Sequence, residues 1–243
     1  MKCNLWIAVT LAVAAAIGIP NVALRAASFE ASDNATVQPG GPRSGSSGKA
    51  FVNIEGSSNG NFASYAVADF NFAGSGLGPI TGVENVTIEL TESNAGFSAN
   101  GPMSFYYTAQ TGVDIQPGSG VAYQAGQDGV GSVGGSFGAL TLLGSGTYDV
   151  TANGEVESFA LSFIGDALAG FVDAVNNGTT LRLVITPDAA GTAATYAGVT
   201  NNTYAGPTLT FDTVTVPEPS AVALGMIGLA ASAAASPPRR QKS

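Results

Sequence analysis

The chain has 243 residues, of which 45% are hydrophobic, and a formal net charge of −9. Residues 28–216 contain three basic and sixteen acidic side chains, so this part carries a net charge near −13. Such a surface repels phosphate, and we expect no nucleic-acid partner. There is no histidine and the single cysteine is Cys3, which excludes disulfides, thiol nucleophiles and imidazole bases from the rest of the chain.

The first 27 residues have the pattern of a secretory signal peptide. Lys2 supplies a positive charge at the start, and residues 5–19 are apolar and uncharged. A helix over residues 5–19 reaches only about 22 Å, which is short of the ~30 Å hydrocarbon core of a membrane. We therefore expect residues 1–27 to be a signal peptide cleaved after Ala26 or Ala27. A flexible segment, rich in Gly, Ser and Pro, is expected over residues 28–48.

The last 27 residues, 217–243, combine three features in a fixed order. A Pro-Glu-Pro motif precedes an apolar stretch at residues 221–236, and arginines follow near the end. This order resembles the PEP-CTERM sorting domain. The resemblance implies cleavage near the motif by an exosortase, a membrane-bound cysteine protease, after transient inner-membrane association through the C-terminal helix. It also implies a destination at the cell surface or in an exopolysaccharide-containing matrix. The sorting residues are Pro217, Glu218, Pro219, Arg239 and Arg240.

Residues 49–216 have mostly the apolar period of two that is typical of β-strands. Val86, Ile88 and Leu90 alternate with polar residues, and turn sequences such as Asn153-Gly154 separate the strands. About ten short strands with one buried face each predict an all-β fold, an antiparallel jelly-roll-like sandwich. Residues 166–178 have helical spacing instead and predict one short helix across an end of the sandwich.

The end of this region resembles a known type of domain. Strand-like runs at residues 181–187, 194–198 and 206–209 are similar to the close of DNRLRE-type jelly-roll domains. The resemblance implies a shape like that of carbohydrate-binding modules, and a shape alone does not define an activity.

Carboxylates are the acid–base groups available for catalysis. Glu155 and Glu157 share one face of a predicted strand, and Glu89 and Asp114 could meet other acids in the fold. A glycosidase needs two carboxyl groups roughly 5 to 9 Å apart in a cleft, which sequence spacing does not establish. We expect no catalysis, and a carboxylate-based polysaccharide-degrading enzyme is the alternative.

Tyrosine is the aromatic residue expected to contact sugar, because the single tryptophan, Trp6, lies in the signal. Tyr106 and Tyr107 are neighbours on one strand and therefore face opposite ways, and Tyr196 and Tyr204 lie near loop or strand ends. We expect an exported, non-catalytic protein that scaffolds or binds exopolysaccharide. No cofactor is expected, although the many oxygen ligands leave a structural Ca²⁺ ion open. A further alternative is a Ca²⁺-dependent homophilic adhesin.

Overall fold

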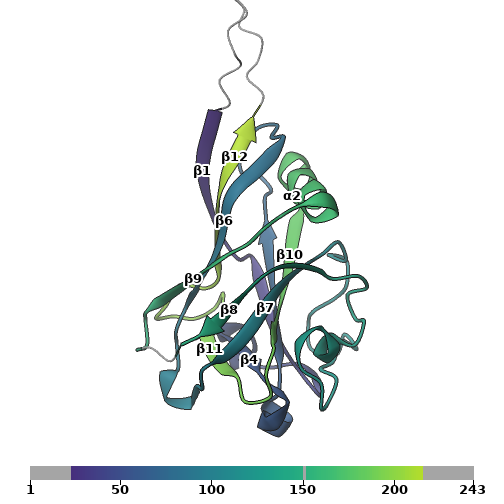
Figure 1. Cartoon of the computed structure of the whole chain (residues 1–243), viewed down its shortest axis with the longest axis vertical. Helices are drawn as coiled ribbons and strands as arrows, with labels where there is room; N and C mark the ends of the chain where they lie inside the picture. Colours follow the sequence, from purple (N-terminus) through teal and green to yellow (C-terminus); the bar gives the residue numbers. More distant parts are fainter. Residues whose placement is uncertain (1–22, 150–151, 216–243) are drawn as a thin grey trace, which may run out of the picture. The chain divides into compact units, whose positions relative to one another are not determined.

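The computed structural model describes residues 23–149 and 152–215 (Figure 1). The chain divides into two compact units. One of them, residues 24–214, contains most of the described residues. Its strands form a four-stranded, a six-stranded and a two-stranded sheet. The predicted all-β antiparallel sandwich with a short helix is confirmed.

The four-stranded sheet has the order β1-β12-β6-β9. Its strands are β1 (Ala23–Glu30), β12 (Thr208–Thr215), β6 (Gly82–Thr91) and β9 (Val156–Ala160). Val86, Ile88 and Leu90 of β6 are buried in the main core, as their alternation predicts. This core is shared with the six-stranded sheet and is built around Phe70, Phe105, Phe171, Leu183 and Phe211.

The six-stranded sheet is covered on both faces. Its order is β3-β2-β5-β10-β7-β8. The strands are β3 (Gly41–Pro42), β2 (Asp33–Gln38), β5 (Tyr65–Asn71), β10 (Thr180–Pro187), β7 (Gly101–Thr108) and β8 (Thr141–Tyr148). Along β10, Leu183 faces the main core and Val184 a second core, which also contains Tyr65, Tyr123 and Phe137. The expectation of one buried face per strand is therefore wrong for β5 and β10, because residues 109–140 fold over the outer face of the sheet.

The two-stranded sheet pairs β4 (Phe51–Glu55) with β11 (Ala193–Ala197). Single bridges join it to its surroundings, from Glu55 to Ser64 and from Tyr196 to Glu92. Val52 and Ile54 of β4 point into the main core. Alternation therefore directs the intervening side chains of β4 to the opposite face of the sheet.

The predicted helix is α2 (Gly165–Asn177), which lies at one end of the sandwich in Figure 1, whereas β4 and β11 lie toward the other end. Phe171 and Val175 place it against the main core. Gly170 permits a close approach, because a Cβ atom there would lie 1.9 Å from the hydroxyl oxygen of Tyr107. The short helices are α1 (Ser46–Ala50), η1 (Ser57–Phe62), η2 (Ala95–Phe97) and η3 (Gly129–Val133).

The segment at residues 28–48 differs from its prediction. It contains the end of β1, then β2, β3 and the start of α1, so the predicted flexible segment is wrong. Packing of Phe29 accounts for part of this regular structure. The centre of its ring lies 4.9 Å from that of Phe72 and 5.9 Å from that of Phe211. The expected cleavage positions, Ala26 and Ala27, lie inside β1.

The remaining terminal predictions fall outside the described residues. These include the apolar part of the signal and the sorting residues Pro217, Glu218, Pro219, Arg239 and Arg240. In the part of the chain that the structure describes, no helix is long and apolar enough to cross a membrane.

Candidate functional site

A groove of about 400 Å³ lies over the two-stranded sheet, and we call it the β4–β11 groove. Asn53 and Thr195 form its floor, since they are only 7% and 4% exposed. Phe62 and Phe97 are its most exposed aromatic lining, at 64% and 82%. The full lining is Arg43, Phe51, Asn53, Glu55, Phe62, Asn94, Phe97 and Thr195.

Strand alternation explains why these side chains share one surface. Val52 and Ile54 are held in the main core, so Phe51, Asn53 and Glu55 project from the other face of β4. On β11, Thr195 is the direct partner of Asn53 in the antiparallel register. The groove floor is therefore a polar cross-strand pair flanked by β4 side chains.

Asn53 is the centre of a hydrogen-bond network in the groove. Its side-chain oxygen accepts a hydrogen bond from Nη1 of Arg43 at 3.2 Å. Its side-chain nitrogen donates to Oε1 of Glu55 at 3.0 Å and to the hydroxyl of Thr195 at 3.2 Å. The amide thus lies between the guanidinium and the carboxylate and fixes the position of both.

The charged groups of the groove are only partly compensated. Burial raises the pKa of the Glu55 carboxyl, and the hydrogen bond from Asn53 and the charge of Arg43 oppose that rise. Within residues 23–149 and 152–215, the guanidinium of Arg43 makes one hydrogen bond and no ion pair. Because a guanidinium has five N–H donors, most of them remain available to a ligand.

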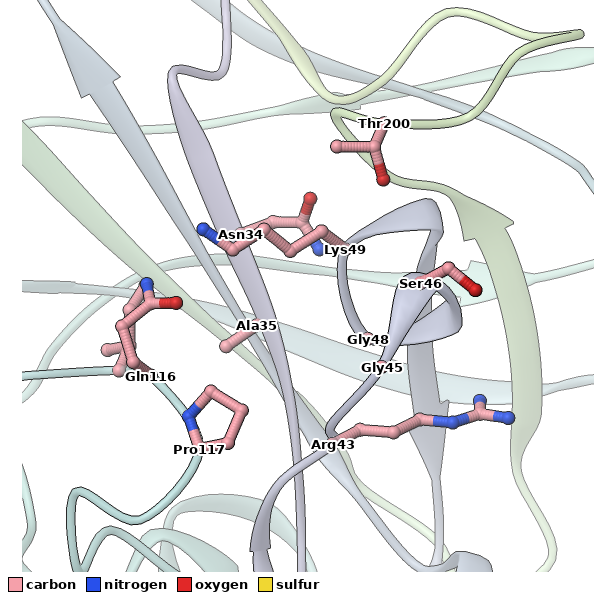
Figure 2. Close-up of a pocket in the computed structure, with 11 residues that line it drawn as sticks. Asn34, Ala35, Arg43, Gly45, Ser46, Gly48, Lys49, Gln116, Pro117 and Thr200 are labelled. Carbon is pink, nitrogen blue, oxygen red and sulfur yellow. The ribbon is translucent and has the colours of Figure 1, made fainter.

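A neighbouring hollow of about 250 Å³ contrasts with the groove (Figure 2). Lys49 lines it, and its amine lies 2.8 Å from Oδ1 of Asp33. The other oxygen of Asp33 accepts a hydrogen bond from Gln116 at 2.9 Å. Figure 2 shows the Arg43 side chain running away from Gln116 and Pro117. Lys49 and Gln116 of this hollow therefore both contact Asp33, whereas Arg43, which also lines the hollow, directs its guanidinium to Asn53 in the groove.

The position of Arg43 depends on the packing of α1. A Cβ atom at Gly48 would lie 2.1 Å from the carbonyl oxygen of Arg43, so only glycine fits there without a shift of the backbone. The amide of Arg43 also donates to the carbonyl of Thr36 at 2.8 Å. The backbone of Arg43 is thereby held from two sides.

None of the four predicted tyrosines lines the β4–β11 groove. Tyr196 is fully buried and donates its hydroxyl to Glu157, so the prediction that it contacts sugar is wrong. Tyr106 packs on the second core and Tyr107 on the main core, which confirms that they face opposite ways. Tyr204 is partly buried, and its ring lies against Gly154.

Sequence reasoning missed the aromatic residues that are exposed. Phe62 ends η1 and Phe97 ends η2, and each follows a polar, glycine-containing turn. A large apolar side chain in a turn, outside any period of two or 3.6, was the available signal. Tyrosines were expected to contact sugar because the single tryptophan, Trp6, lies in the signal, and phenylalanine was not considered for this role.

Elsewhere in the sandwich, a buried carboxylate, Glu92, lies near a partly buried one, Glu157. Glu92 is fully buried, and both its oxygens lie 2.7 Å from the hydroxyl of Tyr148. Glu157 accepts hydrogen bonds from Tyr196 and from the Asp149 amide. Burial raises the pKa of Glu157, while the Tyr196 hydrogen bond opposes the rise and the charge of Glu92 adds to it.

This carboxylate pair differs from the one that the sequence suggested. Glu157 pairs with Glu92 rather than with Glu155, which is exposed and precedes β9. Because Glu92 has no exposed surface, a substrate in this structure does not reach it. Among the described residues, no group of three or more carboxylates is placed to hold a metal ion.

Neither a protein-family model nor a curated protein sequence matches the chain.

Proposed function

We propose that this protein is exported and binds exopolysaccharide through the β4–β11 groove without cleaving it. The observation that supports binding most directly is the combination of two exposed phenylalanine rings with a pre-arranged polar network. Phe62 and Phe97 are exposed, and in the same groove Asn53 forms hydrogen bonds with both Arg43 and Glu55.

A glycan matches this mixture of surfaces. A sugar ring has an apolar C–H face and a rim of hydroxyl groups, so it needs an apolar wall beside a few fixed donors and acceptors. Ligand sites generally have this composition, with mostly apolar lining and a small number of placed polar groups. The Arg43 guanidinium supplies donors, and Asn53 already orients it.

The binding proposal is tested with the full-length protein on an array of neutral and uronate-containing oligosaccharides. We expect Phe97→Ala and Phe62→Ala to weaken binding about tenfold each, as loss of an aromatic contact residue commonly does. Leu142→Ala is the matched control, because Leu142 is 56% exposed on β8 and does not line the groove. Unchanged binding by both phenylalanine variants contradicts the proposal.

Export rests on the sequence of the two ends. The apolar start, the Pro217-Glu218-Pro219 motif and the terminal arginines support processing by signal peptidase and an exosortase. Tags placed on either side of Pro217 should separate in cell fractionation, with the preceding tag outside the cell. An intact chain that keeps both tags in the cytosol contradicts this part of the proposal.

The same oligosaccharides test the enzymatic alternative. We expect no release of new reducing ends during incubation with the protein. Release that is abolished by Glu157→Gln would instead assign polysaccharide cleavage to the Glu92–Glu157 pair.

A further inference from the structure

We propose that the β4–β11 groove selects acidic glycans, with the carboxylate of a uronate residue bound by the Arg43 guanidinium. This inference rests on the proposed glycan-binding function and names its ligand class. The observation behind it is an arginine that forms no ion pair within residues 23–149 and 152–215, in a region where acids greatly outnumber bases.

The four cations of the described residues differ in what they contact. Arg182 and Lys49 each form an ion pair with an aspartate, at 2.7 and 2.8 Å. Arg25 donates to the carbonyl of Gly76 at 3.4 Å. Arg43 donates only to the neutral amide of Asn53 in the part of the chain that the structure describes. Among the described residues, Arg43 is therefore the cation of the β4–β11 groove, and it forms no ion pair there.

The local geometry keeps Arg43 from its nearest acid in the groove. Asn53 accepts from Arg43 at 3.2 Å and donates to Glu55 at 3.0 Å, so the amide stands between the two charges. With one N–H held by Asn53, the remaining donors of the planar fork stay oriented. A planar carboxylate accepts two parallel N–H bonds from such a fork.

The charge of the whole domain favours a carboxylate over a more highly charged anion. Residues 28–216 carry sixteen acidic and three basic side chains, and this field repels a doubly charged phosphate more strongly than a singly charged uronate. Phe62 and Phe97 add an apolar surface for the ring that bears the carboxylate. Both features indicate a sugar acid rather than a free inorganic anion.

The test compares trisaccharides of galacturonate and mannuronate with their uncharged methyl esters, by calorimetry on the full-length protein. We expect at least one acid to bind about tenfold more tightly than its ester. Arg43→Gln should remove this preference, because it lowers the affinity for the acid far more than the affinity for the ester. Lys49→Gln is the matched control, since it removes one positive charge from the neighbouring hollow and should keep the preference.

Glu55→Gln provides a second variant with the opposite sign. Removing the Glu55 charge leaves Arg43 with no acid beside it in the groove, so affinity for the acid should increase severalfold while affinity for the ester does not. A decrease would contradict the inference, because it would make Glu55 a direct contact to the sugar rather than a competitor for Arg43.

The outcomes separate the inference from the proposed function. Equal affinity for acid and ester, or an acid preference that survives Arg43→Gln, overturns the selection of acids by Arg43 and leaves glycan binding intact. Binding of a neutral oligosaccharide on the array without binding of either trisaccharide acid has the same consequence. Binding to no oligosaccharide overturns both.

Discussion

Arg182 and Arg43 show two uses of the same side chain in one sandwich. The side chain of Arg182 is 3% exposed and donates through Nε and Nη2 to the two oxygens of Asp69, both at 2.7 Å. Its Nη1 donates to the carbonyls of Gln110 and Val113, and its guanidinium lies 5.5 Å from the ring centre of Phe137. Within the described residues, Arg43 has one neutral acceptor and faces a groove.

A buried cation stabilises the fold when acceptors of the protein surround it. Around Arg182 the protein supplies acceptors from β5 and from residues 109–140, so this arginine links the outer covering to the sheet. Around Arg43, Asn53 orients the guanidinium, and no acidic side chain of the described residues forms an ion pair with it. Its charge is therefore open to a bound anion. We therefore expect substitutions at Arg182 to affect stability and substitutions at Arg43 to affect recognition.

The largest expected effect is at the buried pair. Arg182→Ala leaves the Asp69 carboxylate buried and unpaired, and we expect the free energy of unfolding to fall by about 3–5 kcal/mol. Arg43→Ala should lower it by less than about 1 kcal/mol, since its single hydrogen bond is partly exposed. Urea denaturation of both variants measures the difference, and equal losses would remove the distinction between the two arginines.

The next effect links the backbone of α1 to recognition. In Gly48→Ala the new methyl group would lie 2.1 Å from the Arg43 carbonyl oxygen, so we expect a shift of Arg43 and a loss of about 1–3 kcal/mol in stability. The acid preference in calorimetry should weaken although Gly48 does not line the β4–β11 groove. Ser46→Ala, an exposed position in the same helix, is the control and should change neither quantity. A Gly48→Ala protein with the wild-type preference would show that the backbone contact does not position Arg43.

The pH dependence of stability tests whether the Glu157 carboxyl has a raised pKa in the folded protein. Burial raises the pKa of Glu157 in the folded protein, so the folded state binds its proton more readily than the unfolded state does. As the pH falls from neutral through that pKa, wild type should therefore gain stability relative to Glu157→Gln, and it should lose this gain as the pH rises again. Urea midpoints of both proteins at a series of pH values measure the change. A constant difference between the two midpoints contradicts a raised pKa.

The fold was largely predictable wherever the pattern was local. Val86, Ile88 and Leu90 are buried because alternation along β6 is enough to decide their side of the sheet. The segment at residues 28–48 was missed because long-range packing orders it. Phe29 meets Phe72 and Phe211, residues far away in the chain, and no local period announces that contact.

The groove was not predictable for the same reason. Asn53 and Thr195 are 142 residues apart and become partners only through the register of β4 and β11. The role that we propose for Arg43 depends on its neighbours in the folded structure. In the sequence it is only one cation in a Gly- and Ser-rich run. Composition showed which chemistries were absent, while the pairing of distant strands decided where the remaining polar groups gather.

We expect the smallest effect on stability at Lys49. Its ion pair with Asp33 is 2.8 Å long, but the two side chains are 39% and 28% exposed, so solvent screens it. Lys49→Gln should therefore change stability by about 0–1 kcal/mol, well below the effect at Arg182. A loss comparable to that of Arg182→Ala would mean that pairing with an aspartate, rather than complete burial, decides whether a cation in this domain is structural. A loss of acid preference in the same variant would move the anion site from the Arg43 guanidinium toward the neighbouring hollow.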